Sequence, residues 1–120
     1  MSTPLVSIII PLKNAEKYIE QALASILVET AIPLEVVIID DQSEDQSISV
    51  VKKKADQRVK ICQGKAQGIS SALNLGLEAS SGEIIMRCDA DDYYQKMRIQ
   101  QQYQWLSENR EFIAVCGSFA

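Results

Sequence analysis

The sequence predicts an α/β fold: a doubly wound, mostly parallel sheet with helices on both faces. Apolar strand-like runs alternate with amphipathic helical segments along the chain, and the connections between them are short. Two of the apolar runs stop at groups of aspartates, which is typical of buried parallel strands that bring polar groups to the edge of a sheet. With 120 residues, the chain has the length of one domain with a sizeable core.

The first half of the chain is expected to form two strands with a helix between them. Leu5 to Pro11 is the first strand, and Pro11 is expected to end it because proline cannot donate a ladder hydrogen bond. Asn14 is a candidate N-cap for a helix over about residues 15–28, where apolar side chains recur at three-and-four spacing. Leu34 to Ile39 is the second strand.

The second half of the chain repeats this alternation. Ser43 or Asp45 can cap a short helix that ends near Lys54. The pattern then predicts strands over 59–62, 83–88 and 113–116, a loop over 63–68, and helices over 69–79 and 97–109.

The two acidic groups are Asp40-Asp41, after the second strand, and Asp89-Ala90-Asp91-Asp92, after the fourth. Aspartates are also common as turn formers and helix caps, and either group alone would fit that interpretation. Two such groups at equivalent strand ends, each repelling itself, instead favour a site for a cation and a phosphorylated ligand. If strand geometry continues past residue 88, Asp89 and Asp91 point the same way and can converge on one Mg²⁺ or Mn²⁺ ion.

Composition excludes several other functions. The formal charge is −4, and no basic stripe is present, so nucleic acid is not expected as a partner. Cys62, Cys88 and Cys116 occur without any histidine, which removes the parts for a zinc site or for Cys-His catalysis and predicts reduced thiols in a cytosolic protein. The longest apolar stretches have strand length, so no membrane segment is expected.

Other sites known on such sheets fit less well. The turn after the first strand, Pro11 to Asn14, lacks the glycines of a dinucleotide site, and Gly64-Lys65 lacks the remainder of a P-loop. A haloacid-type phosphatase would carry its Asp-x-Asp motif on the first strand rather than the fourth. A receiver-like signalling domain stays open as an alternative, although its acidic pair should follow the first strand. A free-standing nucleotide- or metal-binding module also stays open.

Four segments, in order and at family spacing, resemble the amino-terminal half of an inverting glycosyltransferase of family 2, which has the Rossmann-like GT-A fold. Residues 6–14 resemble the family's opening strand and asparagine turn, and residues 37–45 its acidic second-strand segment. Residues 68–77 with 81–85 resemble the stretch that leads into the DxD motif, here Asp89-Ala90-Asp91. Arg98 and Gln101 fit the segment that follows it.

The resemblance implies a role for each matching residue. Pro11 and Asn14 would line the nucleotide pocket, Asp41 would contact the base, Asp89 would lie near the ribose and phosphates, and Asp91 would coordinate Mn²⁺ or Mg²⁺, with Asp89 as a second metal ligand.

Two positions depart from the family pattern. Gln42 stands in place of the usual glycine, and Leu73 stands where many members carry an arginine that contacts the pyrophosphate. Lys65 is the candidate substitute for that arginine.

Residues 1–120 are therefore expected to be the donor-binding part of a truncated glycosyltransferase domain, with a nucleoside diphosphate sugar, first of all a UDP-sugar, as partner. No catalytic residue is assigned, because the family's general base is expected beyond residue 120. The apolar run over 112–120 predicts that the chain was cut there and that the exposed edge promotes self-association. The resemblance further implies hexosyl transfer in cell wall or polysaccharide synthesis, in the cytoplasm or peripherally at the inner face of the membrane.

Overall fold

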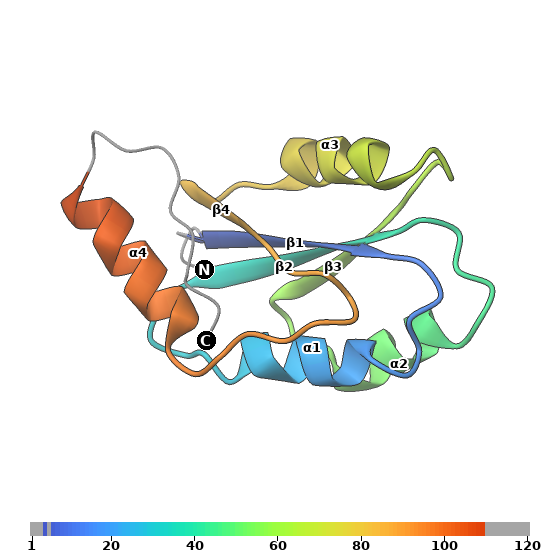
Figure 1. Ribbon diagram of the computed structural model, residues 1–120, viewed down its shortest axis with the longest axis horizontal. Coiled ribbons are helices and arrows are strands. Elements are labelled where there is room, and N and C mark those ends of the chain that lie inside the picture. Colours follow the sequence, from blue (N-terminus) through green and yellow to red (C-terminus); the bar gives the residue numbers. More distant parts are fainter. Residues whose placement is uncertain (1–3, 5, 110–120) are drawn as a thin grey trace.

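The computed structural model describes residue 4 and residues 6–109, and within them it contains four strands and four helices in strict alternation (Figure 1). In chain order, they are β1 (Val6–Leu12), α1 (Ile19–Leu27), β2 (Leu34–Asp40), α2 (Ser47–Lys54), β3 (Val59–Gln63), α3 (Ile69–Ala79), β4 (Ile84–Arg87) and α4 (Arg98–Glu108).

The four strands form one parallel sheet in the order β3-β2-β1-β4. The chain moves outward from β1 to β2 and β3, and then crosses back to place β4 on the other side of β1. This reversal between β1 and β4 is the topological switch point of the sheet. Because every strand runs in the same direction, all four carboxyl ends meet at one edge, which is where open α/β sheets bind ligands.

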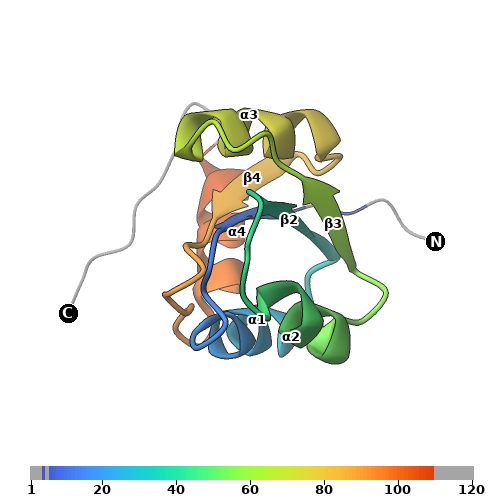
Figure 2. The ribbon, with the colours of Figure 1, turned by 90° about the vertical axis from the view of Figure 1, so that its right-hand side faces the viewer.

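Helices cover both faces of this sheet. Figure 2 shows α3 on one face and α1 and α2 on the other. The face under α1 and α2 carries the larger apolar cluster, in which Ile8, Ile10, Val36 and Ile38 are fully buried. The apolar cluster under α3 is smaller, and its buried residues include Ile9 of β1 and Ala72 of α3. A Cβ atom on Gly76 of α3 would lie 2.5 Å from Cγ2 of Ile9, so a glycine at this position allows the helix to approach the sheet closely.

The predicted fold class is confirmed, and so are the strands and helices between residues 6 and 109, with shifts at their ends. Pro11 lies inside β1 rather than ending it. The backbone of Ile9 faces β4, because its carbonyl accepts the Cys88 amide, and Pro11, two residues further on, faces the same side. Strand β4 pairs with β1 only as far as Ile9, so no ladder donor is needed at Pro11, while β2 pairs with β1 up to Leu12. The predicted strand over 113–116 lies outside the described residues. No helix in the described part of the chain combines the length and apolar character needed to cross a membrane.

Helix α1 begins later than the sequence predicts, and Asn14 is not its cap. The N-cap is Tyr18, which makes no side-chain capping bond, and residues 16–18 form a turn before the helix. Neither candidate cap for α2 is its N-cap, which is Gln46, without a side-chain capping bond. Asp45, one residue earlier, accepts a hydrogen bond from the backbone amide of Ser47 at 2.9 Å, and Ser43 Oγ accepts one from the backbone amide of Asn14.

A polar network fastens α3 to the amino-terminal edge of the sheet. Glu35 of β2 accepts hydrogen bonds from Ser7 Oγ at 2.6 Å and from the Ser81 amide at 2.7 Å, and Lys60 Nζ lies 3.0 Å from its second oxygen. Burial acts to raise the pKa of Glu35, but these hydrogen bonds outweigh it and lower that pKa. The carboxylate therefore stays charged and holds the end of α3 beside β1 and β2.

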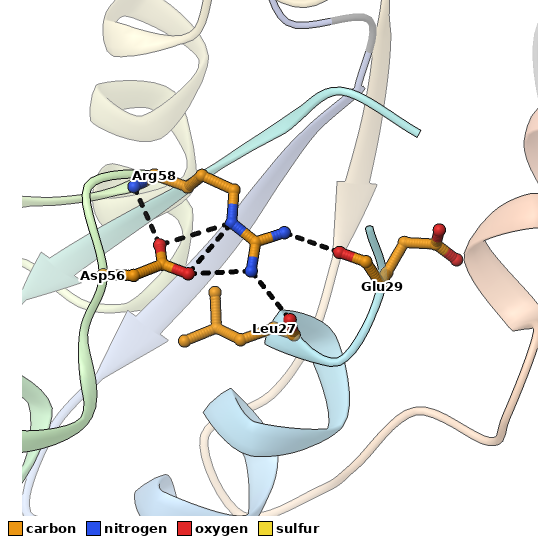
Figure 3. A network of polar contacts seen from close by, with 4 residues as sticks. All are labelled: Leu27, Glu29, Asp56 and Arg58. Atoms are coloured by element: carbon orange, nitrogen blue, oxygen red, sulfur yellow. Dashed lines mark hydrogen bonds and ion pairs between the residues drawn. The ribbon is translucent and has the colours of Figure 1, made fainter. Parts of the chain in front are cut away.

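Arg58 fulfils a similar role at the carboxyl end of α1 (Figure 3). Its guanidinium donates to the carbonyl oxygens of Leu27 at 2.7 Å and Glu29 at 2.6 Å. The Leu27 carbonyl is one of those that a helix end leaves without an intrahelical partner, and Glu29 follows the C-cap Val28. Asp56 pairs with the same guanidinium, and this hydrogen bond lowers the pKa of Asp56. The contact links α1 to the start of β3 and uses the positive charge that favours a helix carboxyl end.

Arg58→Ala is expected to lower the free energy of unfolding by about 2 kcal/mol, because two partly buried carbonyls lose a charged donor. The matched control is Lys54→Ala, which removes an ion pair with Glu20 whose side chains are 51% and 58% exposed. This control should cost less than about 0.5 kcal/mol. Urea unfolding measures both, and equal effects of the two substitutions would contradict the capping role of Arg58.

Candidate functional site

The two acidic segments lie at the same edge of the sheet, on opposite sides of β1. Asp40 ends β2, and only Cys88 lies between the end of β4 and the segment 89–92. The carboxyl end of β1, with Pro11 on its α3 face, lies between them. The switch point is thus flanked by the loop after β1 and by the acidic segment after β4, so both acidic groups lie at the edge where open α/β sheets bind ligands.

The side chains of Asp40 and Asp41 lie on opposite faces of the sheet, and each accepts one backbone amide. The Asp40 carboxylate faces α1 and α2 and accepts the Ser43 amide at 3.0 Å, as a turn-forming aspartate does. Asp41 is only 7% exposed on the α3 side, where Oδ1 accepts the Ala66 amide at 2.7 Å. Its Oδ2 has no hydrogen-bond partner among the described residues. A Cβ atom on Gly64 would lie 2.7 Å from Asp41 Oδ1, so glycine at 64 keeps this carboxylate in place.

Asn14 joins the loops that follow β1 and β2. Its φ is 51°, a left-handed conformation that asparagine tolerates better than most residues. The side-chain oxygen accepts the amides of Glu44 at 2.7 Å and Asp45 at 3.3 Å. The conformation and both contacts make Asn14 a residue that shapes the edge, a role that sequence reasoning missed because its partners lie about thirty positions away.

The DxD segment forms a turn rather than a continued strand. Strand β4 ends at Arg87, and the Asp92 amide donates to the carbonyl of Asp89 at 3.0 Å. The expectation that strand alternation aligns Asp89 and Asp91 is therefore wrong, although both are exposed in the same tight turn. Asp89 accepts hydrogen bonds from Arg87, and Asp91 has no hydrogen-bond partner within the described part of the chain.

Buried neighbours hold this turn against α1. Ala90 and Tyr94 lie in the larger apolar cluster, and Tyr94 Oη donates to the carbonyl of Arg87 at 2.6 Å. The Tyr94 amide donates to Ser25 Oγ of α1 at 2.9 Å, and the Arg98 guanidinium lies 4.7 Å from the tyrosine ring centroid. Burial raises the pKa of Tyr94, so its hydroxyl keeps the proton that it donates.

The cysteines act as packing residues in this part of the structure. Cys88 is buried beside the turn, and burial, followed by the nearby aspartates, raises the pKa of its thiol to about 12. Cys62 is half-buried on β3, and neither forms a disulfide. A thiol with so high a pKa is a poor nucleophile near neutral pH. Cys116 lies outside the described residues.

Lys65 lies near Asp41 and away from the DxD turn. It is exposed in the loop after β3, on the Asp41 side of the edge, with β2 and β1 between β3 and β4. The structure therefore brings Pro11 and Asp41 together on the α3 side of the edge, places Asp89 and Asp91 across the end of β1, and leaves Lys65 beside Asp41.

The acidic turn fits a divalent cation only in part. No group of three or more His, Cys, Asp or Glu side chains within residues 6–109 is arranged to hold a metal ion. Mg²⁺ and Mn²⁺ bound with nucleotides, however, commonly take one or two carboxylates and complete their coordination with phosphates and water. Asp89 and Asp91, exposed in one turn, match that donor set.

Comparisons with known proteins agree on one family. The family described as Glycosyl transferase family 2 matches residues 7–120. The uncharacterized glycosyltransferase EpsJ of Bacillus subtilis (strain 168) is 33% identical over 97% of this chain and 34% of its own length. An uncharacterized glycosyltransferase of Haemophilus influenzae is 37% identical over 97% of this chain and 36% of its own length. The chain thus spans about a third of the length of these curated relatives.

Solved structures of similar proteins include complexes with donors. S. aureus TarS 1–349 in complex with UDP-GlcNAc gives a TM-score of 0.79 at 32% identity, covering 88% of this chain and 32% of that one. The mannosyltransferase PcManGT from Pyrobaculum calidifontis, in complex with GDP-Man and Mn²⁺, gives a TM-score of 0.80 at 29% identity, covering 89% and 33%.

Two substitutions test the role of Asn14. Asn14→Gly keeps the left-handed backbone but loses the side-chain acceptor, and should cost about 1 kcal/mol of unfolding free energy. Asn14→Ala loses both and should cost roughly 1–2 kcal/mol more. Hydrogen exchange at the amides of Glu44 and Asp45 should accelerate in both variants. Unchanged exchange at these amides would show that the Asn14 side chain does not hold the loop.

Proposed function

The chain belongs to glycosyltransferase family 2, and on that premise we propose that it binds the donor, a nucleoside diphosphate sugar, together with a divalent cation. Family membership replaces the receiver-like alternative. Because the chain spans about a third of the length of the two curated relatives named above, the activity of the whole enzyme is also a proposal.

One observation carries this proposal. The buried carboxylate of Asp41 and the exposed carboxylates of Asp89 and Asp91 lie at the same sheet edge, on either side of the switch point. A nucleoside diphosphate has a neutral base at one end and a charged diphosphate at the other. The edge offers an acceptor for the base on the β2 side, where one oxygen of Asp41 has no partner among the described residues, and two exposed carboxylates after β4 that can hold a cation for the diphosphate.

Each residue then has a distinct task. Oδ2 of Asp41 accepts a hydrogen bond from the base, and the ring of Pro11 provides an apolar wall beside it. Asn14 contributes by fixing the loop that borders the pocket. Asp91, with Asp89, would hold Mn²⁺ or Mg²⁺, which supplies charge stabilisation to the departing diphosphate.

The reaction proposed for the whole enzyme is inverting transfer. The acceptor hydroxyl oxygen forms a bond to the anomeric carbon while the bond between that carbon and the diphosphate oxygen breaks, and a general base takes the hydroxyl proton. We place that base beyond residue 120, together with the residues that hold the acceptor. A hexosyl unit carried on UDP is the first candidate donor, since the TarS complex contains UDP-GlcNAc, and GDP is the second, since the PcManGT complex contains GDP-Man.

The first test of this function is metal-linked nucleotide binding. Mn²⁺ and UDP should each bind at least about tenfold more tightly in the presence of the other, because the phosphates complete the coordination of the metal. Asp91→Asn should remove this coupling. The matched control is Asp92→Asn, since Asp92 uses Oδ1 to accept the Tyr93 amide at 2.8 Å. Calorimetry in which UDP binds equally well without Mn²⁺, and equally well to Asp91→Asn, would contradict the assignment of the metal site.

The second test concerns sugar transfer. The 120-residue chain is expected to bind donor without transferring the sugar, because we place the general base and the residues that hold the acceptor beyond residue 120. Labelled UDP- and GDP-sugars, Mn²⁺ and a panel of glycan acceptors measure this directly, with donor hydrolysis as a separate readout. Transfer that disappears in Asp91→Asn would place a general base within these residues.

A further inference from the structure

Arg87 lies at the switch point and has no role in the function proposed above. It is the last residue of β4 and pairs with Ile9 of β1, next to the switch point. Its neighbours Met86 and Cys88 are buried in the cluster under α1 and α2. Arg87 therefore points to the α3 face, on the same side of the edge as Pro11 and Asp41.

The contact between Arg87 and Asp89 leaves binding capacity on both side chains. Nε and Nη2 of Arg87 donate to the same oxygen, Asp89 Oδ1, at 3.1 and 2.9 Å. Nη1 of Arg87 and Oδ2 of Asp89 have no partner among residues 6–109. The two side chains are 49% and 50% exposed, so the pair contributes little to stability. This contact therefore orients Asp89 more than it stabilises the fold.

The negative charge at this edge favours a cationic side chain near the DxD turn. Asp40, Asp41, Asp89, Asp91 and Asp92 are all gathered there. A diphosphate that approaches them is repelled, and one divalent metal ion offsets only part of this repulsion. Helix α3, which covers the same face of the sheet, contains no lysine or arginine.

Arg87 and Lys65, the cation that the sequence suggests for the diphosphate, lie at different positions along the edge. Lys65 follows β3, and β3 is three strand spacings from β4, about 14 Å at the usual separation of roughly 4.8 Å. Arg87 is bonded to Asp89, which shares a turn with Asp91. A diphosphate held by a metal ion on Asp91 would lie within reach of Arg87. Lys65 follows β3, at the opposite end of the strand order.

We propose that Arg87 binds the diphosphate of the donor through its free N–H groups while it holds Asp89 in position. This inference rests on the proposed function and adds a specific residue to it. The guanidinium suits the task because its planar set of five donors can serve a carboxylate on one side and a phosphate on the other. Since the Asp89 contact is exposed, a phosphate can share or displace it at little cost.

The experiment compares binding of UDP and uridine in Mn²⁺ buffer to the wild-type chain and to variants, followed by amide NMR shifts so that weak binding is also measured. Arg87→Gln should raise the Kd for UDP about tenfold or more and leave the Kd for uridine within about twofold. Arg87→Lys should recover part of the loss, because it restores the charge without the fork. Lys65→Gln should weaken UDP binding less than Arg87→Gln does. Lys52→Gln, in the last turn of α2, controls for the change in net charge.

Each outcome decides something. If Arg87→Gln binds UDP like the wild type, or loses UDP and uridine equally, Arg87 does not contact the diphosphate and the inference fails while the proposed function stands. A larger loss in Lys65→Gln would assign the diphosphate to Lys65 instead. A wild-type chain that binds neither UDP nor GDP in the presence of Mn²⁺ overturns the proposed function and this inference with it. If the chain prefers GDP, guanosine replaces uridine in every comparison.

Discussion

The pairing of β1 on both sides is the constraint on which the rest of the structure depends. Ile8, Ile9 and Ile10 are at most 2% exposed, so β1 is buried on both faces as well as bonded to both neighbours. Its two ladders differ in length. Strand β2 follows β1 to Leu12, whereas β4 leaves after Ile9. The last residues of β1 therefore have a neighbouring strand on one side only, and the DxD turn, leaving β4 at this point, can lie beside them.

Because side chains alternate along each strand, the residues at this edge lie on one or the other face of the sheet. Asp40 faces α1 and α2 and accepts the amide of Ser43 in its own loop, whereas Asp41 and Arg87 face α3, where Asp41 accepts the amide of Ala66 and Arg87 donates to Asp89. Because side chains alternate with a period of two, a shift of one residue in the register of β2 would exchange Asp40 and Asp41. The register, set by the buried apolar residues of β1 and β2, thus determines which aspartate faces the α3 side.

The sequence was sufficient to predict the features that depend on local patterns. Apolar runs and their spacing gave the order of strands and helices, and the resemblance gave the family, which the comparisons confirmed. Contacts between distant residues were not predictable in this way. Asn14 was expected to cap the following helix, but its oxygen accepts amides about thirty residues later, and nothing in its local sequence indicates that partner. The turn at 89–92 was missed because an apolar run shows where a strand can form but not where its neighbour stops pairing. The roles of Pro11, Asn14, Asp41, Lys65, Asp89 and Asp91 in ligand binding stay predictions.

Within the described structure, Asn14 differs from Asp41 and Asp89 in how many of its side-chain acceptor positions are already occupied. Asp41, held by the Ala66 amide, and Asp89, held by Arg87, each use one carboxylate oxygen and keep the other without a partner. A ligand that meets such oxygens displaces water and breaks no internal bond, so the position of the acceptor is fixed before binding. The oxygen of Asn14 already accepts two amides, and drawing it to a ligand would loosen the loop over 43–47. What separates Asn14 from these two aspartates is therefore the partner that the fold has already assigned to each acceptor oxygen.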